Sequence, residues 1–399
     1  MKKAYIASTI TVIILIVIAL CIKLMIFKAE NNDVMITVGF VNDGDEATPY
    51  SNNFIRSSKM VEAVYGDKVE VIVRNNISEE DCEDAFKYLV EAGCDLIIST
   101  SYGYGVTARK YAEEYPNIEI CQATCSDANT DPVLPNYHNF MGRIYEGRYV
   151  SGLIAGLKMK EMIDDGIITP DQALVGYVGA YPYAEVISGY TAFFMGVSRY
   201  VPEVRMIVKY TYTWDSYSIE KDIAEQLIDE GCVIISQHSD TIGPAVACEN
   251  SDRKIPVYHV GYNQSMLDYA PTTTLVSCRI NWTPYILGAV EACLQNDKIE
   301  NYVDATIIGN DASAGFEKDW VQMIELNGAV AAEGSTEVMN LTIRDFKKGK
   351  VKVFYGEYTG TNPYDPEDTI DLRQGFEENA TTSAPMFCYI LDDVITIEE

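Results

Sequence analysis

The sequence predicts an α/β protein made of two Rossmann-like parallel-sheet lobes of the same topology, with a hinge and a ligand cleft between them. The first observation is an internal repeat. Three segments of the first half recur in the same order in the second half: residues 38–41, 71–73 and 89–100 match residues 175–178, 206–208 and 227–237. The starting positions differ by 137, 135 and 138 residues, which indicates two similar lobes and not an array of many repeats.

The second observation is that apolar strands alternate with helical segments in each half. In the first half we expect strands at 36–43, 69–75, 96–100 and 118–124, and helices at 51–65, 78–92 and 105–115. In the second half we expect strands at 173–180, 204–212, 233–237 and 255–261, with helices ending near 200 and covering 218–230. Continuous apolar strands that alternate with helices are typical of parallel sheets covered on both faces.

The pattern divides the chain into four parts. Residues 1–30 are a signal peptide or membrane anchor, 31–165 form lobe 1 and 166–290 form lobe 2. Residues 291–399 are a return segment that completes the lobes, followed by an acidic C-terminal tail. Further helices are expected at 142–160 and 283–296, where the chain passes near or between the lobes, and a strand at 350–358.

The first 30 residues predict a location at the cell membrane with the body on the extracytoplasmic side. The uncharged stretch 4–22 has 19 residues, close to the roughly 20 needed to span hydrocarbon as a helix, and two lysines precede it. It is either an export signal or an uncleaved anchor. Cys21 ends a segment that resembles a lipoprotein signal box, so lipidation at Cys21 and a plain helical anchor both stay open.

Composition argues against several functions. The chain has 59 acidic and 30 basic residues, a net charge of −29, and such a body repels the phosphates of nucleic acid. Its three histidines have no paired-ligand spacing, so we expect no metal site. Neither GxxxxGK[ST] nor GxSxG occurs, and we predict no cofactor and no enzymatic activity.

The candidate binding residues follow the predicted strands, because ligands of open parallel sheets bind outside the carboxyl ends of the strands. Asp215, Tyr262 and Asn281 are further residues that follow the predicted strands. With two lobes facing one another, the strand ends would line an aromatic and amide-rich cleft that suits a flat, polar, uncharged heterocycle. The predicted ligand residues are Asp43, Tyr50, Asn52, Ser101, Tyr102, Trp214, His238, Asp240, Asn263 and Trp282. Helix capping by His238 and Asp240, and a surface position for Tyr50, stay open.

Five segments resemble one known family. They are FMGRIYEGRYVSGLIAG at 140–156, VGYVGAYPYAEVISGYTAFFMGV at 175–197, QHSD at 237–240, GYN at 261–263 and SCRINWTPY at 277–285. Together they resemble the basic membrane protein family, also called PnrA-like, and most closely its Med-like branch. The resemblance implies a type I periplasmic-binding fold and the role of an extracytoplasmic solute-binding protein of an ABC importer. It also implies an ABC permease and ATPase as partners and a purine nucleoside or base as ligand.

The same resemblance implies roles for individual residues. Tyr50 lies nearest the family's first aromatic and Trp214 takes the place of the second, so the pair would sandwich a purine. Asp43 takes the place of the family's acidic residue. The family's later aspartate falls on Asn263 and its lysine near Ile280, so a free base and a differently held nucleoside both stay open. A membrane-tethered sensor or regulator ectodomain, and an extracellular nucleoside-processing enzyme, are the alternative functions.

Overall fold

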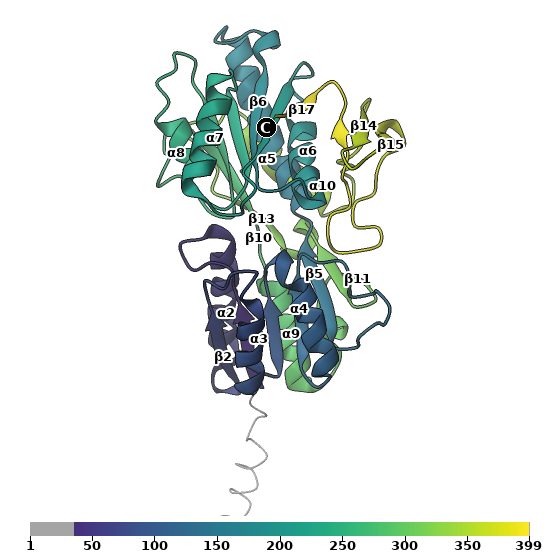
Figure 1. Ribbon diagram of the computed structural model, residues 1–399. Helices are drawn as coiled ribbons and strands as arrows, with labels where there is room; N and C mark the ends of the chain where they lie inside the picture. The colour runs from purple at the N-terminus through teal and green to yellow at the C-terminus, as the bar shows by residue number, and fades with distance from the viewer. Residues whose placement is uncertain (1–35, 399) are drawn as a thin grey trace, which may run out of the picture.

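The computed structural model describes residues 36–398, which fold into two lobes stacked end to end (Figure 1). The predicted signal or anchor at 1–30 and the lipidation site at Cys21 lie outside the described residues. None of the helices between residues 36 and 398 has both the length and the apolar character needed to cross a membrane.

Within the described residues, lobe 1 is a sheet of seven strands with helices on both faces. Its strand order is β11-β12-β5-β4-β3-β1-β2, and only the β11–β12 pair is antiparallel. The strands are β1 (Ile36–Val41), β2 (Val69–Arg74), β3 (Leu96–Ser99), β4 (Glu119–Ala123), β5 (Tyr137–Gly142), β11 (Thr306–Ile308) and β12 (Asp311–Ala314). Helices α2 (Pro49–Tyr65) and α9 (Thr283–Gln295) pack together on the lobe, as do α3 (Cys82–Glu91) and α4 (Gly105–Glu114).

In the described part of the chain, lobe 2 repeats the order of the five strands β2-β1-β3-β4-β5 of lobe 1 and differs from it at the edges of the sheet. Its seven strands have the order β13-β10-β9-β8-β6-β7-β17, and only the β10–β13 pair is antiparallel. The strands are β6 (Leu174–Gly179), β7 (Arg205–Tyr210), β8 (Ile234–His238), β9 (Tyr258–Tyr262), β10 (Thr274–Ile280), β13 (Val321–Ile324) and β17 (Ile395–Glu398). Helices α5 (Ile144–Asp164) and α6 (Ala184–Val197) pack together, and α7 (Tyr217–Asp229) packs on α8 (Gly243–Glu249). Helix α10 (Ser335–Phe346) lies against α5.

The internal repeat of the sequence corresponds to a repeated packing unit. A Cβ on Gly39 of β1 would lie 2.8 Å from Leu89 and 3.1 Å from the sulfur of Cys94. A Cβ on Gly176 of β6 would lie 2.9 Å from Leu227 and 3.1 Å from the sulfur of Cys232. In both lobes the glycine therefore lets the end of the following helix approach the central strand closely.

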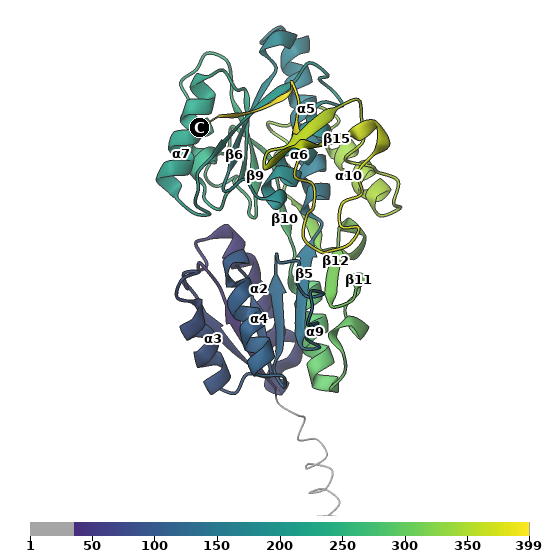
Figure 2. The same cartoon turned by 45° about the vertical axis from the view of Figure 1, so that its right-hand side comes forward.

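The chain passes between the lobes three times within residues 36–398. It crosses between β5 and α5, between β10 and α9, and between β12 and β13 (Figures 1 and 2). Strands β10 and β13 and the end of β5 lie at the junction, with the lobes above and below it. This double-lobed arrangement is the type I periplasmic-binding fold that the sequence predicts.

The C-terminal segment is more ordered than the sequence predicts. Strands β14 (Thr359–Asn362), β15 (Asp365–Asp371) and β16 (Ile390–Leu391) form a separate small sheet, and β17 joins the sheet of lobe 2 beside β7. The predicted strand at 350–358 is wrong, because no residue there pairs in a sheet. Instead Val353 and Phe354 are buried, and the Phe354 carbonyl accepts a single hydrogen bond from Phe376.

Candidate functional site

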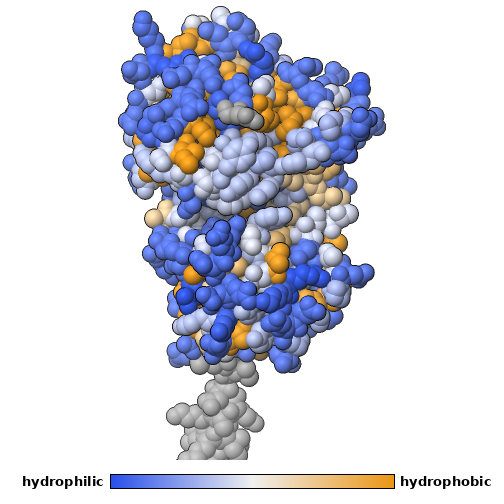
Figure 3. All heavy atoms as spheres, viewed as in Figure 1, coloured by the Kyte–Doolittle hydropathy of each residue, from blue (hydrophilic) through white to orange (hydrophobic). Residues whose placement is uncertain are grey.

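A small cavity lies between the lobes, at the carboxyl ends of the strands of both sheets. In Figure 3 residues of intermediate hydropathy gather at the waist between the lobes, whereas strongly hydrophilic residues cover much of the surface on either side. The described lining includes no lysine and no arginine. Its residues are Asp43, Tyr50, Ser101, Tyr102 and Thr124 from lobe 1, and Glu185, Trp214, His238, Asp240 and Tyr262 from lobe 2.

Lobe 1 contributes a carboxylate and hydroxyl groups. Asp43 follows β1, and its Oδ1 accepts a hydrogen bond from Ser51 Oγ at 2.6 Å. Tyr50 lies in the first turn of α2, which begins with Pro49, and its hydroxyl donates to the Thr100 carbonyl at 2.7 Å. These bonds fix both side chains before any ligand arrives.

Lobe 2 contributes an aromatic cluster around Trp214. The ring centroids of Trp214 and Tyr181 are 5.3 Å apart, and those of Trp214 and Tyr183 are 6.2 Å apart. Tyr181 and Tyr183 stack at 5.1 Å, and both lie in the loop that joins β6 to α6. The indole is therefore held at the cleft edge by two tyrosines and is only partly buried.

Polar groups behind the lobe 2 wall keep His238 neutral. Its Nε2 lies 3.3 Å from Glu185 Oε1, and burial together with the cationic Arg148 lowers the pKa of His238 to about 4. Arg148 is buried on α5, donates from Nη1 to the Gln237 carbonyl at 2.7 Å, and lies 3.7 Å from the ring centroid of Tyr262. With Nε2 facing the Glu185 carboxylate, Nδ1 of the neutral ring is left without a hydrogen-bond partner among the described residues.

Each lobe directs one aspartate into the cavity. Burial raises the pKa of Asp43, and the nearby Asp215 acts in the same direction. Burial raises the pKa of Asp240 well above its usual value, with further contributions from Asp43 and Glu220. The two carboxyl groups therefore interact unfavourably when both are charged, and groups that donate hydrogen bonds or carry positive charge would relieve this repulsion.

The lobes touch across the mouth of the cavity. The ring of Tyr102 from lobe 1 lies 5.4 Å from that of Tyr183 in lobe 2. Asn53 Nδ2 on α2 also donates to the Asn263 carbonyl at 3.0 Å. The structure therefore has the closed arrangement of the two lobes.

Seven predicted ligand residues line this cavity and three do not. Asn52 is on α2, where successive residues point about 100° apart, and it is only partly buried whereas its neighbours Ser51 and Asn53 are buried. Asn263 lies behind the wall, because its Nδ2 donates to Asp240 Oδ1 at 3.0 Å. Trp282 is buried behind Tyr50, stacked on Phe54 with centroids 4.5 Å apart. Asn52 and Trp282 thus lie outside the cavity lining, and Asn263 supports Asp240.

Three lining residues are not among the predicted ligand residues. Tyr262 ends β9 and is one of the strand-end residues that the sequence indicates, and Thr124 follows β4 and obeys the same rule. Glu185 lies in the first turn of α6, several residues beyond the end of β6. Its position depends on the length of the loop before α6, which composition does not specify.

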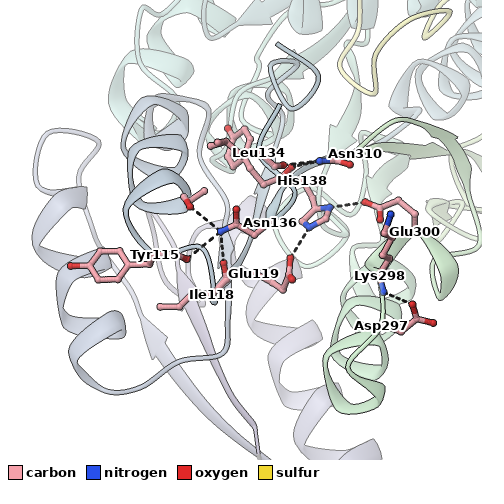
Figure 4. A network of polar contacts seen from close by, with 12 residues as sticks. Tyr115, Ile118, Glu119, Leu134, Asn136, His138, Asp297, Lys298, Glu300 and Asn310 are labelled. Atoms are coloured by element: carbon pink, nitrogen blue, oxygen red, sulfur yellow. Dashed lines mark hydrogen bonds and ion pairs between the residues drawn. The ribbon is translucent and has the colours of Figure 1, made fainter. Parts of the chain in front are cut away.

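A second polar cluster lies near the amino ends of the lobe 1 strands, away from the cavity (Figure 4). His138 on β5 contacts Glu300 Oε1 through Nδ1 at 2.6 Å and Glu119 Oε2 through Nε2 at 2.8 Å. These glutamates raise the pKa of His138 to about 9 against the effect of burial. In the part of the chain that the structure describes, no group of three or more acidic, histidine or cysteine side chains is arranged to hold a metal ion.

Comparison with known proteins identifies relatives of this chain. Residues 32–351 match the family of PnrA-like substrate-binding proteins of ABC transporters. A purine-binding protein of Brucella abortus is 32% identical over 282 residues, covering 70% of this chain and 74% of that protein. A putative ABC transporter glucose-binding protein of Haloferax volcanii is 29% identical over 226 residues, covering 57% and 53%. A solved ABC transporter solute-binding protein of Aeropyrum pernix has the same fold, with a TM-score of 0.63 at 16% identity over 83% of this chain and 95% of that one.

Proposed function

The chain belongs to the PnrA-like substrate-binding proteins of ABC transporters, and from this premise we propose that its ligand is a purine base or nucleoside. The family is one of extracytoplasmic binding proteins that present a small molecule to a permease and ATPase complex. The name of the Brucella relative, at 32% identity, supports the purine class.

The cavity chemistry is the main support for this proposal. The cavity is small and lies between the two lobes. Its described lining places an aromatic side chain and a carboxyl group from each lobe around the same space, Tyr50 with Asp43 and Trp214 with Asp240. A flat ring with several N–H donors matches that combination.

We assign stacking to Trp214 and Tyr50, which come from opposite lobes. Offset or edge contacts between aromatic rings contribute about 0.5–1.5 kcal/mol beyond area burial. Because each lobe supplies one aromatic, the full contact forms only when the lobes close. The ligand would then bind the closed form more tightly than the open form, and this difference in affinity would drive closure of the lobes.

We assign hydrogen bonding to Asp43, Asp240 and the neutral His238. Carboxylates accept hydrogen bonds from the N–H groups of a base or the hydroxyls of a ribose. A phosphate would meet these carboxyl groups with no lysine or arginine in the described lining to balance it. We therefore expect bases and nucleosides to bind and nucleotides to be rejected.

The location and partners follow from the family. We propose that residues 1–30 keep the protein at the outer side of the membrane, by a helix or by a lipid at Cys21, beside the permease that it serves. We further propose that the protein binds its ligand without converting it.

Calorimetric titration of the full chain in mild detergent tests the ligand class. Adenine, adenosine and guanosine represent bases and nucleosides, AMP tests the exclusion of phosphate, and glucose tests the ligand class in the name of the Haloferax relative. We expect heat from at least one base or nucleoside and binding of AMP that is weaker by tenfold or more, about 1.4 kcal/mol.

Two results would overturn the proposal. Binding of glucose with no response to any purine would replace the ligand class. Conversion of adenosine or guanosine during prolonged incubation, followed by chromatography, would show an enzyme and not a binding protein.

A further inference from the structure

The C-terminal extension, defined here as residues 352–398, begins where the family match ends at residue 351. The comparison with the Aeropyrum structure covers 95% of that protein but only 83% of this chain, so part of this chain has no counterpart there. We infer that the extension is a strap that ties lobe 2 to lobe 1 and stabilises the closed form of the binding cleft.

The extension is fixed to lobe 2 at two places. Strand β17 pairs in parallel with β7, and Lys209 on β7 bridges Glu230 and Glu398 at 3.1 Å each. Glu378 is buried, and its Oε1 accepts a hydrogen bond from Ser188 Oγ on α6 at 2.8 Å. The extension must therefore move with lobe 2.

The rest of the extension is packed by contacts between its own residues. The rings of Phe354 and Phe387 stack with centroids 4.5 Å apart, and Phe376 meets Phe387 edge-on at 5.3 Å. Asn379 Nδ2 donates to the carbonyls of Ser383 and two neighbouring residues at 2.6–3.2 Å, which closes the loop on itself. A unit held in this way transmits a restraint from one end to the other.

One end of this unit reaches lobe 1. The backbone N–H of Ser383 donates to Asp311 Oδ2 on β12 at 2.9 Å, and both residues are 2% exposed. Figure 2 shows the loop of the extension descending from the small sheet to the level of β12. A groove separates much of the extension from the interlobe crossings, and Arg143 and Glu317 at the crossings face it. The extension therefore reaches Asp311 across this groove and is not packed continuously against the crossings.

The position of Asp311 makes this contact sensitive to opening of the lobes. Asp311 is three residues before the end of β12, about 10 Å along the strand from the third crossing at a rise of about 3.3 Å per residue. A rotation of about 15°, as in known interface rotations, moves a point at ~10 Å from the axis by roughly 2.6 Å. That displacement is enough to break the 2.9 Å bond.

The other end of the extension reaches the loop that carries the cleft aromatics. The Tyr364 hydroxyl donates to the Pro182 carbonyl at 2.5 Å. Pro182 lies between Tyr181 and Tyr183, and Tyr183 is the residue that meets Tyr102 of lobe 1 across the mouth. Tyr364 is thus a positioning residue for the lobe 2 side of the cleft.

Hydrogen–deuterium exchange of the full chain, without any ligand, tests the strap. The readout is the exchange rate of peptides that cover the cleft segments 100–104 and 179–185. Asp311→Ala removes the acceptor in lobe 1, and we expect about fivefold faster exchange at both segments, the equivalent of about 1 kcal/mol for one hydrogen bond. Asp311→Asn keeps an oxygen acceptor and should restore the slow rate.

Two tyrosine variants serve as a matched pair. Tyr364→Phe removes the bond to Pro182 and should raise exchange at 179–185 only. Tyr389→Phe removes a bond of the same kind to Asp368 within the extension, which reaches neither lobe 1 nor the cleft loop, and should leave both segments unchanged.

Wild-type exchange rates in Asp311→Ala would overturn the strap, as would equal acceleration by Tyr389→Phe. If Asp311→Ala fails to fold, the exposed Tyr364 decides: unchanged exchange at 179–185 in Tyr364→Phe overturns the inference. None of these results depends on whether the ligand is a purine.

Discussion

Lobe 1 and lobe 2 share the order of their five central strands and the same glycine, leucine and cysteine packing unit, yet their buried histidines titrate in opposite directions. His138 in lobe 1 lies between two glutamates, and its pKa is raised to about 9. His259 in lobe 2 is buried beside Gln237 and Thr274, and burial lowers its pKa to about 3. The duplicated fold therefore fixes where strands and helices lie, while each lobe has its own charge balance.

The two lobes also supply different functional groups to the cleft. Lobe 1 supplies hydroxyl groups from Tyr50, Ser101 and Thr124, whereas lobe 2 supplies an indole and an imidazole from Trp214 and His238. A single lobe would offer only half of these groups. The ligand site is thus a property of the pair, and the following three experiments test how far the lobes differ.

The largest expected effect concerns the close helix pair of lobe 2. A Cβ on Gly152 of α5 would lie 2.1 Å from the Phe193 carbonyl oxygen on α6. Because that contact is with backbone, Gly152→Ala should force the helices apart and lower the free energy of unfolding by about 3 kcal/mol, measured by urea denaturation.

The control for this prediction is another glycine in the same lobe. A Cβ on Gly328 meets no atom within 4 Å, and its φ lies outside the left-handed region. Gly328→Ala should be neutral or stabilise by about 0.4–1 kcal/mol. Equal stability of the two alanine variants would contradict the expected clash between α5 and α6, because it would mean that the helices move apart without a cost in stability.

The second prediction uses the charged histidine of lobe 1. The folded pKa of His138, about 9, exceeds the usual 6.5, so the stability it contributes is complete below about pH 6.5 and is lost as the pH rises through about 9. The free energy of unfolding of the parent protein should therefore fall by on the order of 2–3 kcal/mol between these pH values because of His138. His138→Gln should lack this fall, which urea denaturation at each pH measures.

Other buried groups require a comparison with the parent protein. Burial raises the pKa of Glu146 to about 8 and that of Glu378 to about 7, so these carboxyl groups also weaken the fold as the pH rises. The difference between parent and variant isolates His138. His259→Asn should instead improve stability below about pH 6.5, and identical pH profiles for both variants would contradict the proposed contrast between lobes.

The smallest of the three effects is on ligand affinity. Trp214→Ala should weaken binding of the purine identified by calorimetry at least about tenfold, or 1.4 kcal/mol, because one face of the ring loses its contact. Tyr217→Ala removes an exposed aromatic of α7 that does not line the cavity, and should leave the affinity unchanged. Equal affinities of parent and Trp214→Ala would exclude stacking on lobe 2.

The fold was predictable because its signals are local and occur twice. Gly39 and Gly176 each lie within a continuous apolar strand, and each is followed at nearly the same distance by the leucine and cysteine that pack on it. Strand ends then identified seven of the cavity residues. The same reasoning could not show that Asn52 faces away, because helix rotation depends on the first residue of α2, or that Trp282 turns into the core.

The extension was less predictable for a physical reason. Residues 350–358 alternate as a strand does, but Phe354 is drawn into the aromatic cluster with Phe376 and Phe387, which are more than 20 residues further along the chain. Such contacts depend on the tertiary structure and leave no periodic signal. The bond from Ser383 to Asp311 joins residues on different lobes and is equally invisible to local patterns.

The pairing of β17 with β7 has a consequence for the order in which lobe 2 can form. Ile395 pairs with Met206, so the edge of this sheet is completed by a segment 189 residues later in the chain. Until that segment has been synthesised and has arrived, β7 is an open edge with unpaired backbone groups, the kind of surface on which chains aggregate. The complete sheet of lobe 2 can therefore form only after this late segment has joined it.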